Sequence, residues 1–163
     1  MEVQKIYFDM DSVLADFVRG VREICGMEAG THDAKDDDMW ALIKAADHFY
    51  YRLEPVEGAK AMFDSIYGRF GDRVEILTAV PKKKRGILTA GDDKTRWIRE
   101  MFSGDVKVNI VVREEKMQFC KGKGCILIDD LEKNIEEWKA AGGTGILFRN
   151  AEQALKEFEE IIA

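Results

Sequence analysis

The chain has 163 residues, of which 46% are hydrophobic and 34% charged, and it carries a formal net charge of −6. This length suits one domain, or one domain with a modest insertion, and it can bury a sizeable core. The acidic balance argues against a general nucleic-acid coat protein, so no stable nucleic-acid complex is expected. The sequence contains neither a membrane-spanning run nor a secretory leader, and a cytoplasmic location is expected.

The amino-terminal segment ends in two carboxylates. An apolar, β-prone run from Val3 to Phe8 leads to Asp9 and Asp11. Two negative charges this close raise each other's free energy unless a cation or a proton lies between them. Oxygen ligands favour a hard ion such as Mg²⁺, which commonly keeps a substrate phosphate in its coordination shell. The alternative is that Asp11 or Ser12 only caps the next helix.

Helical and strand-like segments alternate along the rest of the chain. Helical periodicity predicts helices over residues 13–25, 39–46, 58–70, 92–102, 131–141 and 151–161. Short apolar runs predict further strands over residues 74–77, 106–112, 125–128 and 144–148. This alternation predicts an α/β fold with three layers, in which helices cover both faces of a Rossmann-like parallel sheet of about five strands.

Polar residues follow the later predicted strands at the point where each ends. The second strand ends in Thr78, the third leads to Arg113 and Lys116, and the fourth ends in Asp129 and Asp130. In open parallel sheets, ligands bind at the carboxyl ends of the strands. Together with the first acid pair, these residues indicate a phosphate and metal site, the alternative being that they are helix caps.

This combination resembles the haloacid dehalogenase superfamily of phosphohydrolases over nearly the whole chain. Asp9-Met10-Asp11 matches the first motif, Leu77-Thr78 the second, a lysine the third and Ile128-Asp129-Asp130 the fourth. Within the superfamily, the chain is most similar to the 5'(3')-deoxyribonucleotidases and their bacterial relatives. Further residues that carry this resemblance are Leu53-Glu54-Pro55, Lys94-x-x-Trp97 and Asn134-Ile135-x-x-Trp138.

Two features depart from the pattern of these nucleotidases. Ser12 stands where they usually have Gly, so its backbone geometry must permit a side chain. The lysine of the third motif lies further from Asp129 than in the mammalian nucleotidases. Lys116 is the preferred candidate, with Lys121 or Lys94 as the alternatives.

The resemblance implies a Mg²⁺-dependent phosphoric monoester hydrolase. Asp9 would be the nucleophile and would form an aspartyl-phosphate, a role that suits a carboxylate ionised at neutral pH. Asp11 would protonate the leaving oxygen and then deprotonate the attacking water. Mg²⁺ would be held by the side chain of Asp9, the main-chain carbonyl of Asp11 and Asp129, with Asp130 acting through water or as a support.

The resemblance also implies how the phosphate is held. Thr78 and the amide of Ala79 would donate hydrogen bonds to phosphate oxygens, and Lys116 would neutralise the charge that the metal leaves. Arg113 is a further candidate for substrate binding. The substrate is expected to be a small phosphate monoester, a nucleoside or deoxynucleoside monophosphate. A sugar phosphate or a polynucleotide 3' end is the alternative, and a catalytically weak protein that binds phosphorylated ligands is a third reading.

Residues 13–56 would form a small helical cap, while residues 1–12 and 57–163 would form the core domain. The cap would exclude water and select the leaving group. An aromatic ring in it could stack on a base. Phe17 and Phe49 are the candidates for substrate contact, whereas Trp40 is assigned to the core of the cap.

The basic run Lys82-Lys83-Lys84-Arg85 follows the second motif directly. It is interpreted as a solvated loop, with attraction of phosphorylated substrates as the alternative. His32 and His48 lack ligand-like spacing and are assigned no chemistry. The oligomeric state stays open, with a homodimer as one alternative.

A two-component receiver domain, which is a switch module and not an enzyme, also places acids, a Thr and a Lys around Mg²⁺. Its phosphorylated Asp follows the third strand and precedes the Thr and the Lys. In this chain the order is acids, Thr, Lys, acids, and an insertion follows the first strand. The order excludes the switch module.

Overall fold

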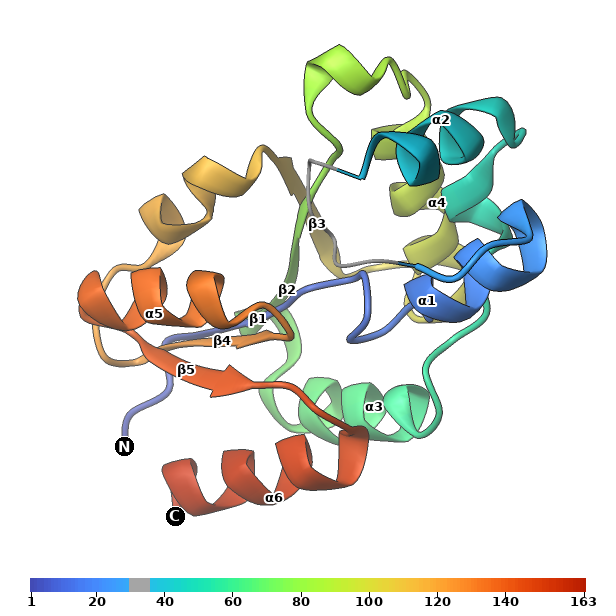
Figure 1. Cartoon of the computed structure of the whole chain (residues 1–163). Coiled ribbons are helices and arrows are strands. Elements are labelled where there is room, and N and C mark those ends of the chain that lie inside the picture. The colour runs from blue at the N-terminus through green and yellow to red at the C-terminus, as the bar shows by residue number, and fades with distance from the viewer. Residues whose placement is uncertain (30–35) are drawn as a thin grey trace.

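A parallel sheet of five strands forms the centre of the molecule, and its strand order is β3-β2-β1-β4-β5 (Figure 1). The computed structural model describes residues 1–29 and 36–163, so His32 lies outside the described residues. The strands are β1 (Lys5–Phe8), β2 (Val74–Ala79), β3 (Lys107–Val111), β4 (Cys125–Asp129) and β5 (Thr144–Leu147). The predicted α/β class with a Rossmann-like parallel sheet is confirmed.

The register of the sheet brings the strand ends together at one edge. Phe8, the last residue of β1, pairs with Ile76 of β2 on one side and with Ile128 of β4 on the other. The amide of Asp9 then donates to the carbonyl oxygen of Ile128 at 3.0 Å. The residues that follow β1 and β4 therefore leave the sheet side by side.

Alternating side chains of the central strands build the core on both faces of the sheet. Ile6, Phe8 and Ile128 belong to a cluster that α3, α4 and α6 complete, whereas Tyr7 and Leu127 pack with α5 on the other face. Figure 1 shows α5 on one side of the sheet and α3 and α6 on the other. The bounds of these helices are Ala59–Phe70 for α3, Ala90–Met101 for α4, Glu132–Ala140 for α5 and Ala151–Ile162 for α6.

The segment between β1 and α3 holds short helices. They are α1 (Phe17–Gly20), the π-turn η1 (Val21–Cys25), α2 (Asp37–Ala45) and the 3₁₀ turn η2 (Phe49–Arg52). The first helix begins later than its periodicity predicts because three successive amides, from residues 13 to 15, donate to the carbonyl oxygen of Met10 and form a tight turn. Asp16 caps α1 by accepting from the Arg19 amide at 3.2 Å, so the alternative that Asp11 or Ser12 caps this helix is wrong.

The predicted cap shares its hydrophobic core with the rest of the molecule. Buried residues of this segment, such as Phe17 and Met39, belong to the same cluster as Trp97 of α4. The indole Nε1 of Trp97 also donates to the carbonyl oxygen of Leu53 at 2.8 Å. The segment therefore packs against α4 and is hydrogen-bonded to it. Its division from the core domain at residues 13 and 56 stays a prediction. Among the described residues, no helix has the length and apolar character needed to cross a membrane.

Candidate active site

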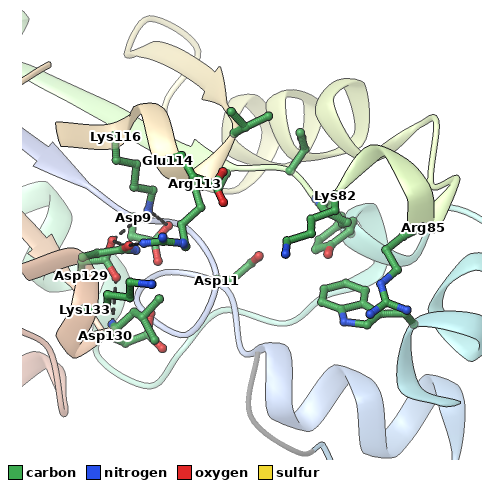
Figure 2. A pocket seen from close by; sticks show the side chains of 18 of the residues that line it. Asp9, Asp11, Lys82, Arg85, Arg113, Glu114, Lys116, Asp129, Asp130 and Lys133 are labelled. Carbon is green, nitrogen blue, oxygen red and sulfur yellow. Dashed lines mark hydrogen bonds and ion pairs between the residues drawn. The ribbon is translucent and has the colours of Figure 1, made fainter. Parts of the chain in front are cut away.

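A cavity of about 730 Å³ opens at the carboxyl ends of β1, β2 and β4 (Figure 2). It is lined by acidic, basic and aromatic side chains from segments far apart in the sequence. Its lining comprises Asp9, Asp11, Trp40, Tyr50, Ala79, Val80, Pro81, Lys82, Lys83, Arg85, Val112, Arg113, Glu114, Lys116, Asp129, Asp130, Leu131, Lys133 and Asn134. The strand ends singled out in the sequence therefore meet at one cavity.

Three carboxylates gather at the base of this cavity. One oxygen each of Asp9, Asp129 and Asp130 lies within 4.8 Å of the others. The ammonium of Lys116, on the 3₁₀ segment η5 (Arg113–Phe119), donates to Asp9 Oδ1 at 3.0 Å and to Asp129 Oδ2 at 2.8 Å. Burial alone would lower the pKa of Lys116, but the negative charges of Asp9 and Asp129 outweigh it and raise this pKa. Lys116 is therefore a fixed positive charge between two acids.

Asp129 is held by hydrogen bonds on both of its oxygens. Its Oδ1 accepts from the amide of Leu131 at 2.9 Å, and its Oδ2 accepts from Asn134 Nδ2 at 3.1 Å as well as from Lys116. Asn134 lies in the first half of α5, which begins directly after β4. The helix thus fixes the orientation of the acid that precedes it.

A second buried lysine lies on the other side of the first acid pair. Lys94 of α4 has no exposed surface, and its ammonium donates to Asp11 Oδ2 at 2.9 Å, to Thr78 Oγ1 at 3.0 Å and to the carbonyl oxygen of Ala79 at 2.6 Å. It also lies 4.7 Å from the centre of the Tyr50 ring. Lys94 therefore ties the first motif to the second from within the protein.

The charges of the site favour a divalent cation. Burial, and then the charges of Asp9 and Asp129, raise the pKa of Asp130 to about 9. Near neutral pH Asp130 therefore holds a proton, which a bound cation would displace while offsetting the charges of Asp9 and Asp129. A purely oxygen donor set of this kind suits Mg²⁺. Asp9, Asp129 and Asp130 would hold it, whereas the structure pairs the Asp11 carboxylate with Lys94.

The predicted phosphate ligands occupy different depths. Ala79 and Arg113 line the cavity, and Arg113 Nη1 donates to Asn134 Oδ1 at 3.0 Å. Thr78 is fully buried beside Lys94 and does not belong to the cavity lining. Lys121 borders a separate hollow near the amino ends of β1 and β4, together with Met1 and other terminal residues, so it is excluded as the lysine of this site.

The aromatic residues of the cap form two tiers. Phe17 and Phe49, the candidates for substrate contact, are buried and do not border the cavity. Phe17 lies 6.2 Å from Trp40 and 6.4 Å from Tyr50, measured between ring centres. Trp40 and Tyr50 are the rings that line the cavity. Phe17 and Phe49 therefore support the lining rings. Trp40 belongs to the hydrophobic core, as predicted, and its ring also borders the cavity.

The basic run combines features of both interpretations. Lys82 and Lys83 are exposed, as predicted for a solvated loop, and together with Arg85 they border the cavity. Their position directly after β2 was the available signal, because that strand ends at the ligand-binding edge of the sheet. Lys133 was not predicted as a site residue, and Asn134 was named only as part of the resemblance, although both follow the fourth motif at the start of a helix.

Solved structures share this fold at low sequence identity. A hydrolase from Streptococcus pneumoniae TIGR4 matches with a TM-score of 0.53 at 13% identity, covering 99% of each chain. A haloacid dehalogenase superfamily hydrolase from Ehrlichia chaffeensis matches with a TM-score of 0.53 at 13% identity, covering 100% of each chain. These similarities support the fold.

Sequence comparison is more specific. A protein of Vibrio phage KVP40 named "Putative 5'(3')-deoxyribonucleotidase" is 28% identical over 130 residues, which is 79% of this chain and 67% of the phage protein. The family model described as "5' nucleotidase, deoxy (Pyrimidine), cytosolic type C protein" matches residues 2–160. This match confirms the predicted family and the class of phosphoric monoester hydrolases. The chain belongs to the cytosolic type C 5' nucleotidase family.

Proposed function

We propose that the protein is a Mg²⁺-dependent phosphatase of nucleoside or deoxynucleoside monophosphates that works through an aspartyl-phosphate on Asp9 in the cytoplasm. The observation that carries this proposal is the cluster of Asp9, Asp129 and Asp130, with Lys116 bound between two of its acids, at the base of a cavity. When bound there, Mg²⁺ would offset the charge of the carboxylates and of the incoming phosphate.

Asp9 has the features that a phosphate-accepting carboxylate needs. It is 7% exposed, borders the cavity and lies at the end of a central strand, so its position is fixed while one edge remains accessible. The contact from Lys116 to Oδ1 orients the carboxylate. Attack by an Asp9 oxygen on phosphorus would form the acyl-phosphate as the ester oxygen departs, and water would then cleave that intermediate at phosphorus.

Asp11 is our candidate for moving the protons of these two steps. Lys94 engages Asp11 Oδ2, while Oδ1 is buried and has no hydrogen-bond partner among residues 1–29 and 36–163. A buried carboxylate oxygen without a hydrogen bond costs folding free energy unless a ligand or water donates to it. We assign Asp11 Oδ1 to the leaving ester oxygen in the first step and to the attacking water in the second.

The remaining lining residues support a nucleotide as the substrate. The cavity of about 730 Å³ lies in the range of small-molecule sites. Trp40 and Tyr50 offer flat apolar surfaces, and Ala79 and Arg113 lie beside the acids where the phosphate would bind. We therefore propose that the phosphate binds against the strand ends and the nucleoside under the predicted cap. Thr78 would contribute indirectly, by accepting the hydrogen bond that helps to position Lys94.

Hydrolysis of p-nitrophenyl phosphate with and without Mg²⁺ tests the enzyme class and the nucleophile together. We expect Mg²⁺-dependent phosphate release that Asp9→Asn abolishes, because an amide cannot attack phosphorus. Asp105→Asn is the matched control, since Asp105 is exposed and does not border the cavity. Full turnover by the Asp9→Asn variant would refute the nucleophile.

A substrate panel then tests the assignment to nucleotides. We expect deoxynucleoside monophosphates to be hydrolysed with a higher kcat/KM than sugar phosphates or an oligonucleotide with a 3' phosphate. A preference for either of those two substrates would replace the nucleotide assignment while leaving the mechanism in place. Binding of nucleotides without turnover of any monoester would identify the protein as a binding protein.

A further inference from the structure

Arg85 is a buried arginine whose hydrogen-bonding capacity is only partly used. It ends the 3₁₀ turn η4 (Lys83–Arg85), and its side chain is 10% exposed. Its Nη1 donates to Asp37 Oδ1 at the start of α2. Its Nε and Nη2 are buried and have no hydrogen-bond partner in the part of the chain that the structure describes. Buried donors of this kind are rare in folded proteins and call for an acceptor.

Arg85 lies in the wall of the cavity described above. So does Trp40, which follows Asp37 by three positions on α2 and therefore shares a helix face with the carboxylate that holds Arg85. Figure 2 shows Lys82 and Arg85 across the cavity from Asp9 and Asp129, with Asp11 between the two groups. A nucleotide whose phosphate lies at the acids would extend its base toward Arg85.

The chemistry of the two nitrogens restricts what they can bind. Nε–H and Nη2–H form one edge of the planar guanidinium and point in nearly parallel directions, so they match two adjacent acceptor atoms. Because Asp37 already holds Nη1, the guanidinium is oriented before the ligand arrives. A base edge that places a donor beside an acceptor would leave one arginine donor unpaired and a second donor facing it.

We propose that this edge of Arg85 selects nucleotides by their base, accepting bases that present two adjacent acceptors while Trp40 stacks on the ring. Guanine presents O6 and N7, and cytosine presents O2 and N3, whereas adenine, uracil and thymine place an N–H beside each acceptor that could pair there. The proposed selection depends on the hydrogen-bonding edge of the base. It therefore groups one purine, guanine, with one pyrimidine, cytosine. This inference rests on the proposed nucleotidase function.

Matched pairs of substrates test the proposal on the unmodified protein. We expect kcat/KM for dGMP to exceed that for dAMP, or kcat/KM for dCMP to exceed that for dUMP, by about tenfold to a hundredfold. The pair that shows the difference identifies whether guanine or cytosine supplies the acceptors. If it is guanine, dIMP should be hydrolysed like dGMP because it keeps O6 and N7, and 7-deaza-dGMP should be hydrolysed like dAMP. Equal kcat/KM within both pairs would overturn the proposal.

Variants assign the selection to Arg85. Arg85→Met should reduce the discrimination ratio to nearly one, and Arg85→Lys should reduce it almost as far because a lysine keeps the charge but lacks the paired donors. Lys84→Met is the matched control: it removes the same charge from the same turn, but Lys84 is exposed and does not border the cavity. An unchanged ratio in Arg85→Met would contradict the proposal.

Two further readouts separate the outcomes. Turnover of p-nitrophenyl phosphate by the unmodified protein reports the proposed function, so its absence is a failure of that function and not of the base selection.

If Arg85 instead held a second phosphate, a nucleoside 3',5'-bisphosphate would be preferred over its monophosphate and Arg85→Met would abolish that preference. That result would replace the base assignment. If Arg85→Met does not fold, the substrate pairs with the unmodified protein decide the question.

Discussion

The two ends of the cavity are built in opposite ways. At the acid end, Asp9 directly follows β1 and Asp129 is the last residue of β4. Lys116 and Asn134 donate hydrogen bonds to oxygens of those acids from within the protein. At the Arg85 end, the lining comes from a turn and a cap helix, and two guanidinium donors remain unpaired among the described residues. The comparison separates acids that are already held by hydrogen bonds, which we propose for phosphoryl chemistry, from an arginine with donors left for a ligand.

Removing Lys116 should produce the largest change at the acid end. Lys116→Met leaves two buried carboxylates uncompensated, so we expect kcat/KM to fall by about 10²- to 10³-fold and the free energy of unfolding to fall by about 3–5 kcal/mol. Enzyme kinetics and urea denaturation measure the two effects. Lys121→Met is the control, since Lys121 borders the separate hollow at the opposite edge of the sheet. Equal losses in both variants would contradict the special role of Lys116.

The two tiers of aromatic residues offer a sharper test. Phe17→Ala removes a buried ring, and we expect it to lower the free energy of unfolding by about 3–5 kcal/mol. Trp40→Ala also removes a buried ring, but it should in addition raise KM for nucleotides by about tenfold, because a stacked base is worth about 1–3 kcal/mol. Its effect on p-nitrophenyl phosphate should be smaller, since that substrate carries no base. A larger KM effect from Phe17→Ala would reverse the assignment of the two tiers.

Mg²⁺ should stabilise the folded protein by binding at the acid end and not at the Arg85 end. Because a ligand that binds only the folded state raises stability by mass action, we expect millimolar Mg²⁺ to raise Tm by several degrees, and EDTA to reverse it. Asp129→Asn should weaken this shift, whereas Arg85→Met should leave it intact. A Tm that does not respond to Mg²⁺ in the unmodified protein would argue against the metal site.

The smallest effect concerns the contact that joins the cap to α4. His48 Nδ1 lies 2.9 Å from Asp93 Oδ1, and the hydrogen bond and charge of Asp93 raise the pKa of His48. A raised folded-state pKa gives stability that is fully present below the unfolded value of about 6.5 and is lost as pH rises through the folded pKa. Tm should therefore decline slightly more from pH 6 to pH 9 in the unmodified protein than in His48→Asn. Parallel pH profiles would show that this pair contributes nothing.

The contrast between the two ends also explains what the sequence could predict. Asp9 directly follows β1, and Thr78 and Asp129 lie in the last two residues of β2 and β4, so the apolar runs that locate the strands also locate these residues. The sheet class follows from the same runs. Local patterns of this kind are the strongest signal that a single sequence contains.

The contacts of residues placed by tertiary packing could not be predicted in this way. The resemblance offered Lys94 as an alternative for the lysine of the third motif, but its contacts with Asp11 and Thr78 depend on how α4 packs beside the first two strands. Arg85 looked like part of a solvated run because its partner, Asp37, is distant in sequence. Phe17 and Trp40 have the same apolar character, and only the packing of the cap decides which ring faces the cavity.

The central claim is that Asp9 accepts the phosphoryl group, and chemical trapping of the intermediate tests it most directly. Borohydride reduces an acyl-phosphate to the alcohol, so treatment during turnover of a monophosphate should convert Asp9 to homoserine, which peptide mass spectrometry can locate. We predict modification at Asp9 that requires both substrate and Mg²⁺. Modification at Asp11 or Asp129 instead, or turnover without any trapped residue, would contradict the account.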